Sequence, residues 1–215
     1  MVNRQRGFTL IEIAIVLVIV GLLLGGVLKG QELITGARVR NMISQQDGIK
    51  AAYFGFLDRY RALPGDFANA STTIPGLAGA VCNNKNGNGD GQITNGAGVE
   101  NVLVWEHLSR AQFINGSYTC AAAVAAATSP TNPYGGFFDL QFDAAYQVPT
   151  GARHNLKTGA AIPSDILAEI DRKVDDGDPT RGSFRAPAAA AATCYGATWI
   201  TAPAPGVDCE ATNLF

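Results

Sequence analysis

The chain opens with a short polar segment and then becomes strongly apolar. Residues 1–7 read MVNRQRG, with two arginines and no acid, and residues 8–28 read FTLIEIAIVLVIVGLLLGGVL. At a rise of 1.5 Å per residue the apolar run would form a helix of about 31 Å, close to the roughly 30 Å of a hydrocarbon core. The pattern predicts a membrane-spanning helix. The basic residues before it predict that 1–7 stay in the cytoplasm and that the rest is exported.

The apolar pattern changes after residue 28. Apolar residues now recur at intervals of three and four as far as Tyr60, with polar residues between them. This spacing predicts that 29–62 continue the same helix in amphipathic form, with one face against a folded domain. Pro64 ends the pattern, because the residue before a proline avoids the helical region. A globular head is therefore expected over 63–215.

The head shows shorter runs separated by turn residues. Strand-like runs occupy 136–142, 146–148, 183–185 and 199–200, and helical patterns occupy 99–112 and 164–173. Ser164 is expected to cap the second of these helices, because a serine side chain can accept a hydrogen bond from the first helical turn. A small antiparallel sheet packed on the long helix accounts for this order. The predicted fold class is α+β.

Charge and histidine content exclude several function classes. The formal net charge is -2, from 16 basic and 18 acidic residues, and no basic stripe runs along the chain, so nucleic acid is not predicted as a partner. His107 and His154 are the only histidines, and neither stands at a suggestive spacing from a Ser or Cys nucleophile. His107 follows Trp105 on an expected helix, where packing is the expected role. No enzymatic activity is predicted.

The four cysteines, at positions 82, 120, 194 and 209, predict disulfides. None forms a CxxC pair or stands near a histidine at a zinc-like spacing. An even count in an exported chain indicates two disulfides. Of the three pairings we favour Cys82–Cys120 and Cys194–Cys209, because each closes a short loop. Closing a loop of about 15 residues stabilises by roughly 3 kcal/mol in the chain-entropy model. Four reduced, buried thiols are the alternative.

One acidic residue interrupts the apolar run. Glu12 lies near its start, where a carboxylate costs about 2.5 to 3.5 kcal/mol on insertion scales and therefore needs a partner. An ordinary secretory signal would be cut after the apolar run, and the small residues of 25–30 would suit such a cut. A signal peptide has no use for the carboxylate, however.

Residues 6–12, RGFTLIE, resemble the cleavage and methylation motif of type IV pilins and of the pseudopilins of type II secretion. The resemblance implies that prepilin peptidase cuts between Gly7 and Phe8 and methylates the new amine of Phe8. It also implies a partner for Glu12, namely the Phe8 ammonium of a neighbouring subunit. A buried ion pair of this kind fixes register, because leaving one of its charges unpaired costs roughly 3 to 5 kcal/mol.

The resemblance implies four segments: a leader at 1–7, a transmembrane and assembly helix at 8–28, its amphipathic continuation at 29–62 and the head at 63–215. The implied partners are prepilin peptidase, other pilin subunits, the inner membrane and the assembly platform. The implied location is the bacterial inner membrane, crossed once, with the head in the periplasm and then in a periplasmic or extracellular filament. Three functions stay open: type IV pilus subunit, type II secretion pseudopilin, and membrane-tethered binding module.

Further segments resemble a branch of proteobacterial pilin-like proteins. They are LPGD at 63–66, the Gly/Asn loop at 86–91, WEHL at 105–108 and KVDDG at 173–177. Many pilins carry a proline about 21 residues after the cut, where their helix unwinds in the filament, and this chain has Lys29 there. The glycines of the apolar run, at 21, 25, 26 and 30, allow two interpretations: local unwinding, or close approach of membrane helices.

Two loops could hold calcium, the one cofactor considered. Residues 86–94 match the first nine positions of a calcium loop, with oxygens from Asn86, Asn88, Asp90 and the backbone of Gln92. The twelfth position is Ala97, where a glutamate is expected. A turn rich in Gly and Asn is the alternative.

Asp175, Asp176 and Asp178 form the second candidate. Three carboxylates so close together repel each other unless a cation or turn amides satisfy them. A solvated turn, in which the aspartates bind local amides, is the alternative here.

Overall fold

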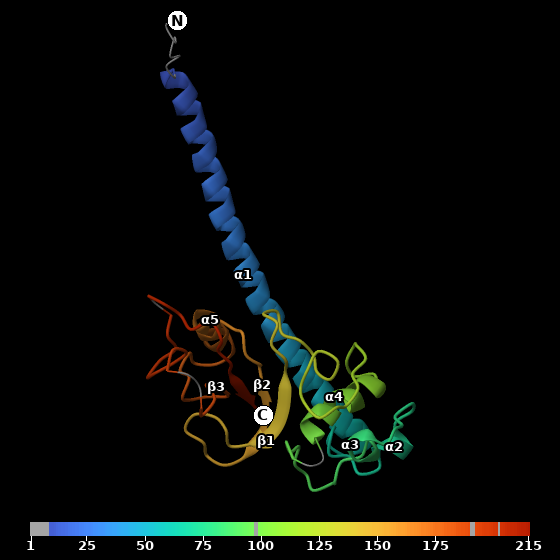
Figure 1. The fold of residues 1–215 in the computed structure, drawn as a ribbon. Helices are drawn as coiled ribbons and strands as arrows, with labels where there is room; N and C mark the ends of the chain where they lie inside the picture. Colours follow the sequence, from blue (N-terminus) through green and yellow to red (C-terminus); the bar gives the residue numbers. More distant parts are fainter. Residues whose placement is uncertain (1–8, 97–98, 190–191, 202) are drawn as a thin grey trace, which may run out of the picture. The chain divides into compact units, whose positions relative to one another are not determined.

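The computed structural model describes residues 9–96, 99–189, 192–201 and 203–215. Two compact units make up the chain, residues 1–40 and residues 41–215. Helix α1, Leu10–Tyr60, contributes to both of them. The expected long helix is therefore present, and the second unit carries the expected small antiparallel sheet, as Figure 1 shows.

The part of α1 in the first unit is exposed and apolar. None of the residues in its most apolar stretch of 18 residues is buried. Among the described helices, only α1 is long and apolar enough to cross a membrane. The helix is continuous through the four glycines, and a Cβ atom at Gly21 or Gly25 would meet nothing within 4 Å. These glycines are therefore open to close approach by another helix.

The part of α1 in the second unit buries one face. The residues on that face are Met42, Ile49, Ala52, Tyr53 and Phe56. Burying a large apolar side chain stabilises by about 1.5 to 3 kcal/mol, so this face is a main source of stability for the head. The helix ends where Arg61 adopts a positive φ of 52° and its N–H binds the Leu57 carbonyl.

A four-stranded antiparallel sheet has the order β1-β2-β4-β3. Its strands are β1 Asp139–Asp143, β2 Arg153–Lys157, β3 Phe184–Arg185 and β4 Thr212–Leu214. Strand β3 falls within a predicted run, and β1 overlaps the run 136–142 and ends one residue beyond it. Tyr146 and Trp199, predicted in strands, instead form isolated bridges with Pro187 and Tyr195.

The predicted strands omitted β2 and β4. The sequence of β2, RHNLK, is polar and reads as a loop, yet Leu156 and Asn155 are fully buried in it. The Asn155 side-chain N–H₂ group donates to the Asp143 carboxylate (2.9 Å) of the neighbouring strand β1. The partner across the sheet thus makes this segment a strand, which its own composition does not indicate.

The described part of the head also contains four short helices: α2 Ala70–Thr73, α3 Val81–Asn84, α4 Glu100–Arg110 and α5 Ser164–Val174. Helices α4 and α5 were expected from the sequence. In Figure 1, α4 lies near α2 and α3, and α5 lies beside β3. The expected capping role of Ser164 is wrong, because its hydroxyl instead donates to the Ile200 carbonyl and accepts from the Gly206 N–H (2.8 Å).

The C-terminal strand is fixed to α1 within the second unit. Lys50 Nζ donates to Asn213 Oδ1 (2.6 Å), and Asn213 Nδ2 donates to Gln46 Oε1 (2.8 Å). The Phe215 ring packs edge-on against Tyr53, with ring centroids 5.0 Å apart. These contacts join the end of the chain to the helix on which the sheet was expected to pack.

Candidate functional site

The predicted cleavage residues, Gly7 and Phe8, lie outside the described residues, and the description begins at Thr9. Thr9 and Glu12 form a reciprocal cap at the start of α1. The Glu12 N–H donates to Thr9 Oγ1 (3.3 Å), while Glu12 Oε2 accepts from the N–H (2.8 Å) and hydroxyl (2.7 Å) of Thr9. This is a capping box, in which two N-terminal amides of a helix are satisfied.

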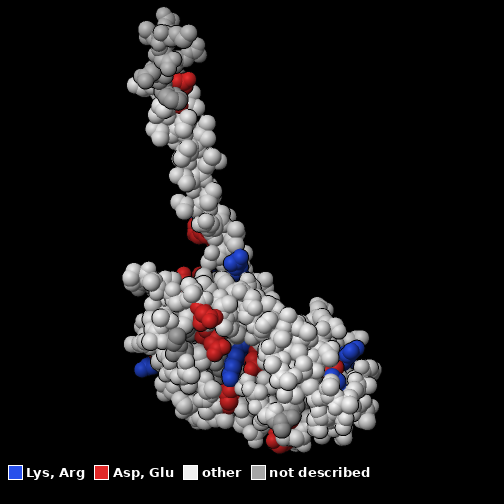
Figure 2. Space-filling model, in the orientation of Figure 1, with Lys and Arg blue, Asp and Glu red and all other residues white. Residues whose placement is uncertain are grey.

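The capping box gives Glu12 a hydrogen-bond partner within its own chain. The signal was present in the sequence as Thr-x-x-Glu, but the interpretation of Glu12 used only its charge. Glu12 is also the only charged residue between positions 9 and 28. Figure 2 accordingly shows that stretch of the helix as almost entirely uncharged.

In the head, the Gly/Asn loop closes around a carboxylate. The N–H groups of Gly89 (2.6 Å) and Asp90 (3.1 Å) donate to Asp66 Oδ1, and that of Gly91 (2.8 Å) donates to Asp66 Oδ2. Burial raises the pKa of Asp66, and the amides of Gly91 and Gly89 oppose that rise. Asp66, from the LPGD segment, is thus the centre of the loop, a role that the sequence analysis did not assign.

The predicted calcium ligands of this loop bind local amides. Asn86 Oδ1 accepts from the Ser71 N–H (2.9 Å), Asn88 Oδ1 from Asp90 (2.9 Å), and Asp90 Oδ1 from Gln92 (2.8 Å). The last two bonds join residues i and i+2, as in Asx turns, whereas Ser71 stands 15 residues before Asn86. The twelfth loop position, Ala97, lies outside the described residues. Calcium in this loop stays a prediction.

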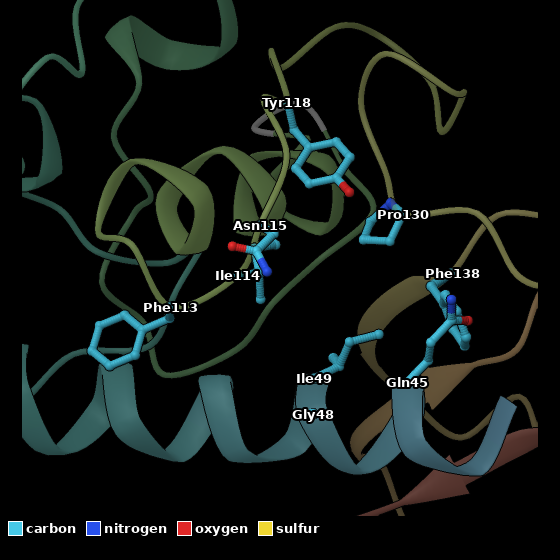
Figure 3. A pocket seen from close by; sticks show the side chains of 9 residues that line it. All are labelled: Gln45, Gly48, Ile49, Phe113, Ile114, Asn115, Tyr118, Pro130 and Phe138. Carbon is cyan, nitrogen blue, oxygen red and sulfur yellow. The ribbon is translucent and has the colours of Figure 1, made fainter. Parts of the chain in front are cut away.

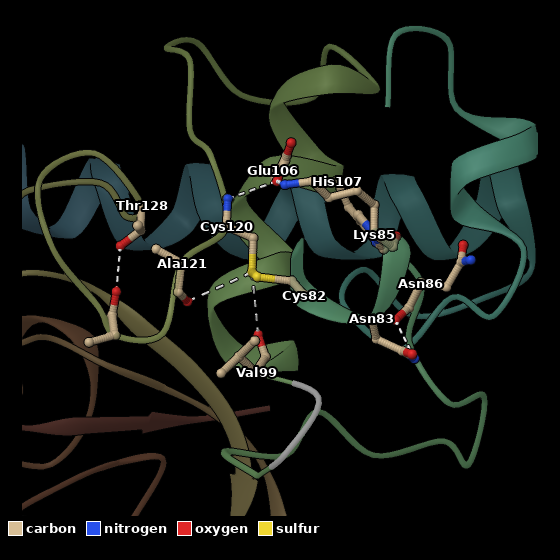
Figure 4. Close-up of a disulfide and its surroundings, with 11 residues drawn as sticks. Cys82, Asn83, Lys85, Asn86, Val99, Glu106, His107, Cys120, Ala121 and Thr128 are labelled. Carbon is tan, nitrogen blue, oxygen red and sulfur yellow. Dashed lines mark hydrogen bonds and ion pairs between the residues drawn. A yellow bond between two sulfur atoms is a disulfide. The ribbon is translucent and has the colours of Figure 1, made fainter. Parts of the chain in front are cut away.

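A buried ionic network joins Lys85, just before the Gly/Asn loop, to α4, as Figure 4 shows. Lys85 Nζ lies 2.7 Å from Glu106 Oε2, and both side chains are only 3% exposed. The same carboxylate oxygen accepts from the Cys120 N–H (2.8 Å). The ammonium and an amide together satisfy a carboxylate that would be costly to bury alone.

His107 packs within the head, as expected for its neighbourhood. Nδ1 accepts from the Gly65 N–H (2.9 Å), and Nε2 lies 2.9 Å from the Lys85 carbonyl, so the neutral ring donates there. Burial lowers the pKa of His107 to about 4. Gly65 has a φ of 88°, and a Cβ there would approach the Glu100 carbonyl to 2.6 Å, so only glycine fits against α4.

Two disulfides are present, Cys82–Cys120 and Cys194–Cys209, the pairs favoured from the sequence. The first connects α3 to the loop after α4, and its sulfur atoms appear at the centre of Figure 4. The second closes a segment of 15 residues near the C-terminus. Both cross-links restrict the unfolded chain and so stabilise the head.

The acidic cluster at the end of α5 differs from the predicted one. Carboxylate oxygens of Asp171, Asp175 and Asp176 all lie within 4.8 Å of one another. Asp178 instead accepts from the Thr180 N–H (2.9 Å) and hydroxyl (2.6 Å). Burial raises the pKa of the Asp171 carboxyl to about 6. The sequence analysis missed Asp171, although it stands one helical turn before Asp175.

A pocket of about 410 Å³ lies in the head, between α1, the loop after α4 and the segment before β1 (Figure 3). Its lining residues are Gln45, Gly48, Ile49, Phe113, Ile114, Asn115, Tyr118, Pro130 and Phe138. Gln45 Oε1 is buried there without a hydrogen-bond partner in the described part of the chain. The volume is in the range of small-molecule sites.

The comparison with protein families finds the prokaryotic N-terminal methylation motif at residues 2–28. This motif is the hallmark of prepilin-type proteins, the type IV pilins and pseudopilins. No curated protein and no solved structure matches the chain. The match covers the expected leader, the expected cleavage site and the apolar run to residue 28, and it does not extend into the head.

Proposed function

Because this chain carries the N-terminal methylation motif of prepilin-type proteins, we propose that it is a structural subunit of a type IV pilus-like filament. The motif carries the proposal. It extends into an exposed apolar helix, and a disulfide-bonded head follows. The pilin-type family consists of structural subunits, which agrees with the absence of a catalytic motif in the sequence.

The proposed processing connects the leader to assembly. Prepilin peptidase cuts after Gly7 and methylates the amine of Phe8, which removes residues 1–7 and leaves 8–28 as the membrane and assembly helix. The new ammonium then pairs with Glu12 of a neighbouring subunit. Before assembly, the capping box with Thr9 supplies hydrogen bonds that lower the cost of keeping the Glu12 carboxylate in the membrane.

The proposed location follows from the same segment. The apolar helix anchors the subunit in the inner membrane, and the positive leader keeps its own end cytoplasmic, so 63–215 enter the periplasm. Residues 29–62 continue the helix toward that head. The disulfides suit an oxidising compartment. The partners are prepilin peptidase, other subunits and the assembly platform.

A substitution at the cleavage site tests the processing step. We expect Gly7→Trp to leave full-length protein in the membrane, because a bulky side chain would replace the glycine that precedes the cut in the motif. N-terminal sequencing of the purified chain checks this, and Gly26→Ala, a glycine substitution in α1 away from the cut, serves as the matched control. If Gly7→Trp protein still begins at Phe8, the cleavage proposal is wrong.

Deletion of the gene tests which filament the subunit serves. Loss of surface filaments in electron micrographs, restored by the wild-type chain, is the expected result. Unchanged surface filaments together with loss of a secreted protein would contradict the pilus proposal and indicate a pseudopilin of type II secretion. Normal filaments and normal secretion would favour a membrane-tethered binding module.

A further inference from the structure

The dipeptide Asn–Gly occurs four times in the chain, at 86–87, 88–89, 95–96 and 115–116. An asparagine followed by glycine readily loses its side-chain amide. The backbone nitrogen of the glycine, which no side chain shields, can attack the carboxamide carbon of the asparagine. In a folded protein the attack depends on how firmly these two groups are held.

The pair Asn88–Gly89 is held at both reacting groups. The Asn88 carboxamide accepts from the Asp90 N–H (2.9 Å) and donates to the Asp90 carboxylate (2.9 Å). The Gly89 N–H donates to Asp66, both to its carboxylate (2.6 Å) and to its carbonyl (3.0 Å). Neither group can turn toward the other unless these bonds break.

The pair Asn86–Gly87 is held as well. Asn86 Oδ1 accepts from the Ser71 N–H (2.9 Å), and the Gly87 N–H donates to the Phe67 carbonyl (3.1 Å). Gly87 is buried, and a Cβ atom there would lie 2.3 Å from the Asp66 Cα. The backbone therefore has no room to bring the nitrogen to the carboxamide. The pair 95–96 adjoins residues 97–98, which lie outside the described part of the chain.

The pair Asn115–Gly116 differs in its hydrogen bonding. Both residues are exposed, in the loop after α4. Neither the Asn115 carboxamide nor the Gly116 N–H has a hydrogen-bond partner in the described part of the chain. The Gly116 carbonyl accepts from the Ser109 hydroxyl (2.6 Å), which fixes the turn but leaves the nitrogen free to react.

The fold also requires glycine at this position. Gly116 has a φ of 108°, which L side chains rarely adopt, and a Cβ atom there would lie 2.9 Å from the Tyr118 hydroxyl oxygen. A residue with a larger side chain would shield the nitrogen, but it would be strained here. The turn after α4 therefore retains the reactive pair.

We propose that Asn115 deamidates spontaneously in the folded protein. The Gly116 nitrogen gives up its proton and bonds to the Asn115 side-chain carbon. The bond from that carbon to Nδ2 breaks, and Nδ2 leaves as ammonia with the proton, so that a succinimide ring forms. Water then opens the ring at either carbonyl. The products are aspartate and isoaspartate at position 115, with one water consumed and one ammonia released, and no oxidant or reductant takes part.

The reaction changes the pocket beside the loop. Asn115 is one of the residues that line the pocket of about 410 Å³ in Figure 3, and none of these residues is charged. Deamidation adds a carboxylate there, and isoaspartate also lengthens the backbone by one carbon atom. An uncharged pocket thus becomes anionic as the protein ages. This chemistry belongs to a single chain and holds whether or not the filament proposal is correct.

Peptide mapping by mass spectrometry of the full chain in detergent tests the proposal. The chain is incubated at mildly alkaline pH in heavy-oxygen water, so that only hydrolysis during the incubation adds the label. We expect position 115 to react at least tenfold faster than positions 86 and 88, because those pairs react only when their loop opens. In urea, where the hydrogen bonds of the loop are lost, the three positions should react at similar rates.

The main comparison is made within one wild-type chain, so it does not depend on whether a variant folds. Asn115→Gln is the matched control, because the longer side chain would have to close a larger and less favoured ring. It should lose the label at position 115 and keep the slow rates at 86 and 88. Equal rates at the three positions of the folded chain overturn the proposal. A folded chain that stays unmodified at position 115, while the chain in urea reacts there, overturns it as well.

Discussion

At the scale of single residues, the buried pair of Lys85 and Glu106 shows how burial determines the contribution of an ion pair to stability. Both side chains are 3% exposed, whereas Lys173 and Glu169, on the surface of α5, are 45% and 35% exposed. Solvent weakens the second pair, and its partners have water as an alternative. The buried pair has no such alternative, so each member depends on the other.

Lys85→Met should therefore destabilise the head strongly. We expect a loss of about 3 to 5 kcal/mol in the free energy of unfolding, because Glu106 would remain buried without its cation. Lys173→Met is the matched control, with an expected loss of about 0 to 1 kcal/mol. Urea denaturation followed by tryptophan fluorescence measures both. Similar losses in the two variants would contradict the argument.

At the scale of elements, His107 fixes α4 to two segments at once. Its ring accepts from the Gly65 N–H just after α1 and lies against the Lys85 carbonyl just before the Gly/Asn loop. Both contacts, as described, use the neutral imidazole. Protonation would place a hydrogen on the nitrogen that accepts from Gly65, so that the two N–H groups would oppose each other. Protonation of His107 would therefore weaken the contact that holds α4 to the residues after α1.

The expected pH dependence follows from the pKa of His107, which is about 4 in the folded head against an ordinary value of 6.5. Between these values the unfolded chain binds a proton that the folded chain does not. Stability is therefore unchanged above about pH 6.5 and falls as the pH drops toward 4, by roughly 2.5 kcal/mol at pH 4.5.

Denaturation midpoints measured from pH 7.5 to pH 4.5 test this dependence. His107→Gln offers an acceptor oxygen and a donor N–H₂ group but does not titrate. The free energy of unfolding of this variant should therefore fall less steeply than that of the wild type as the pH drops. His154→Gln is the comparison, because burial also lowers the pKa of this histidine, which lies outside the α4 contact. If the stability of His107→Gln falls with pH as steeply as that of the wild type, other groups cause the acid sensitivity.

At the scale of the whole molecule, membrane insertion and filament assembly differ in their need for Glu12, the single acidic residue of the apolar run 8–28. Removing the Glu12 carboxylate makes the segment more apolar, so insertion should be unaffected. Under the proposed function, removal also leaves the Phe8 ammonium of a neighbouring subunit unpaired in the filament. The two steps should therefore respond differently to the same change.

Glu12→Ala is expected to fractionate with the membrane at wild-type levels and to abolish filaments. Membrane fractionation and electron microscopy measure the two outcomes. Thr9→Val serves as a comparison, because it removes the hydroxyl of the capping box while it leaves the Glu12 carboxylate in place. Normal filaments from Glu12→Ala would contradict the proposed ion pair between Glu12 and the Phe8 ammonium of a neighbouring subunit.

The elements recognised from sequence alone are those with strong local signals. The long helix, α4 and α5 have helical periodicity, and cysteine spacing favoured the disulfide pairs that the structure contains. Strands β2 and β4 were missed because their residues are polar or few, and their hydrogen bonds come from distant strands. Ser164 was misassigned because its hydroxyl binds Ile200 and Gly206, which are distant in sequence.

The sequence by itself determined the membrane helix and the methylation motif, because both depend on contiguous residues and on their transfer from water to lipid. Only the tertiary structure decided the chemistry of the head. Asp66 binds a loop more than 20 residues later, His107 joins two remote segments, and Asp171 replaces Asp178 in the acidic cluster. Such contacts depend on chain segments that folding brings together, and no local pattern records them.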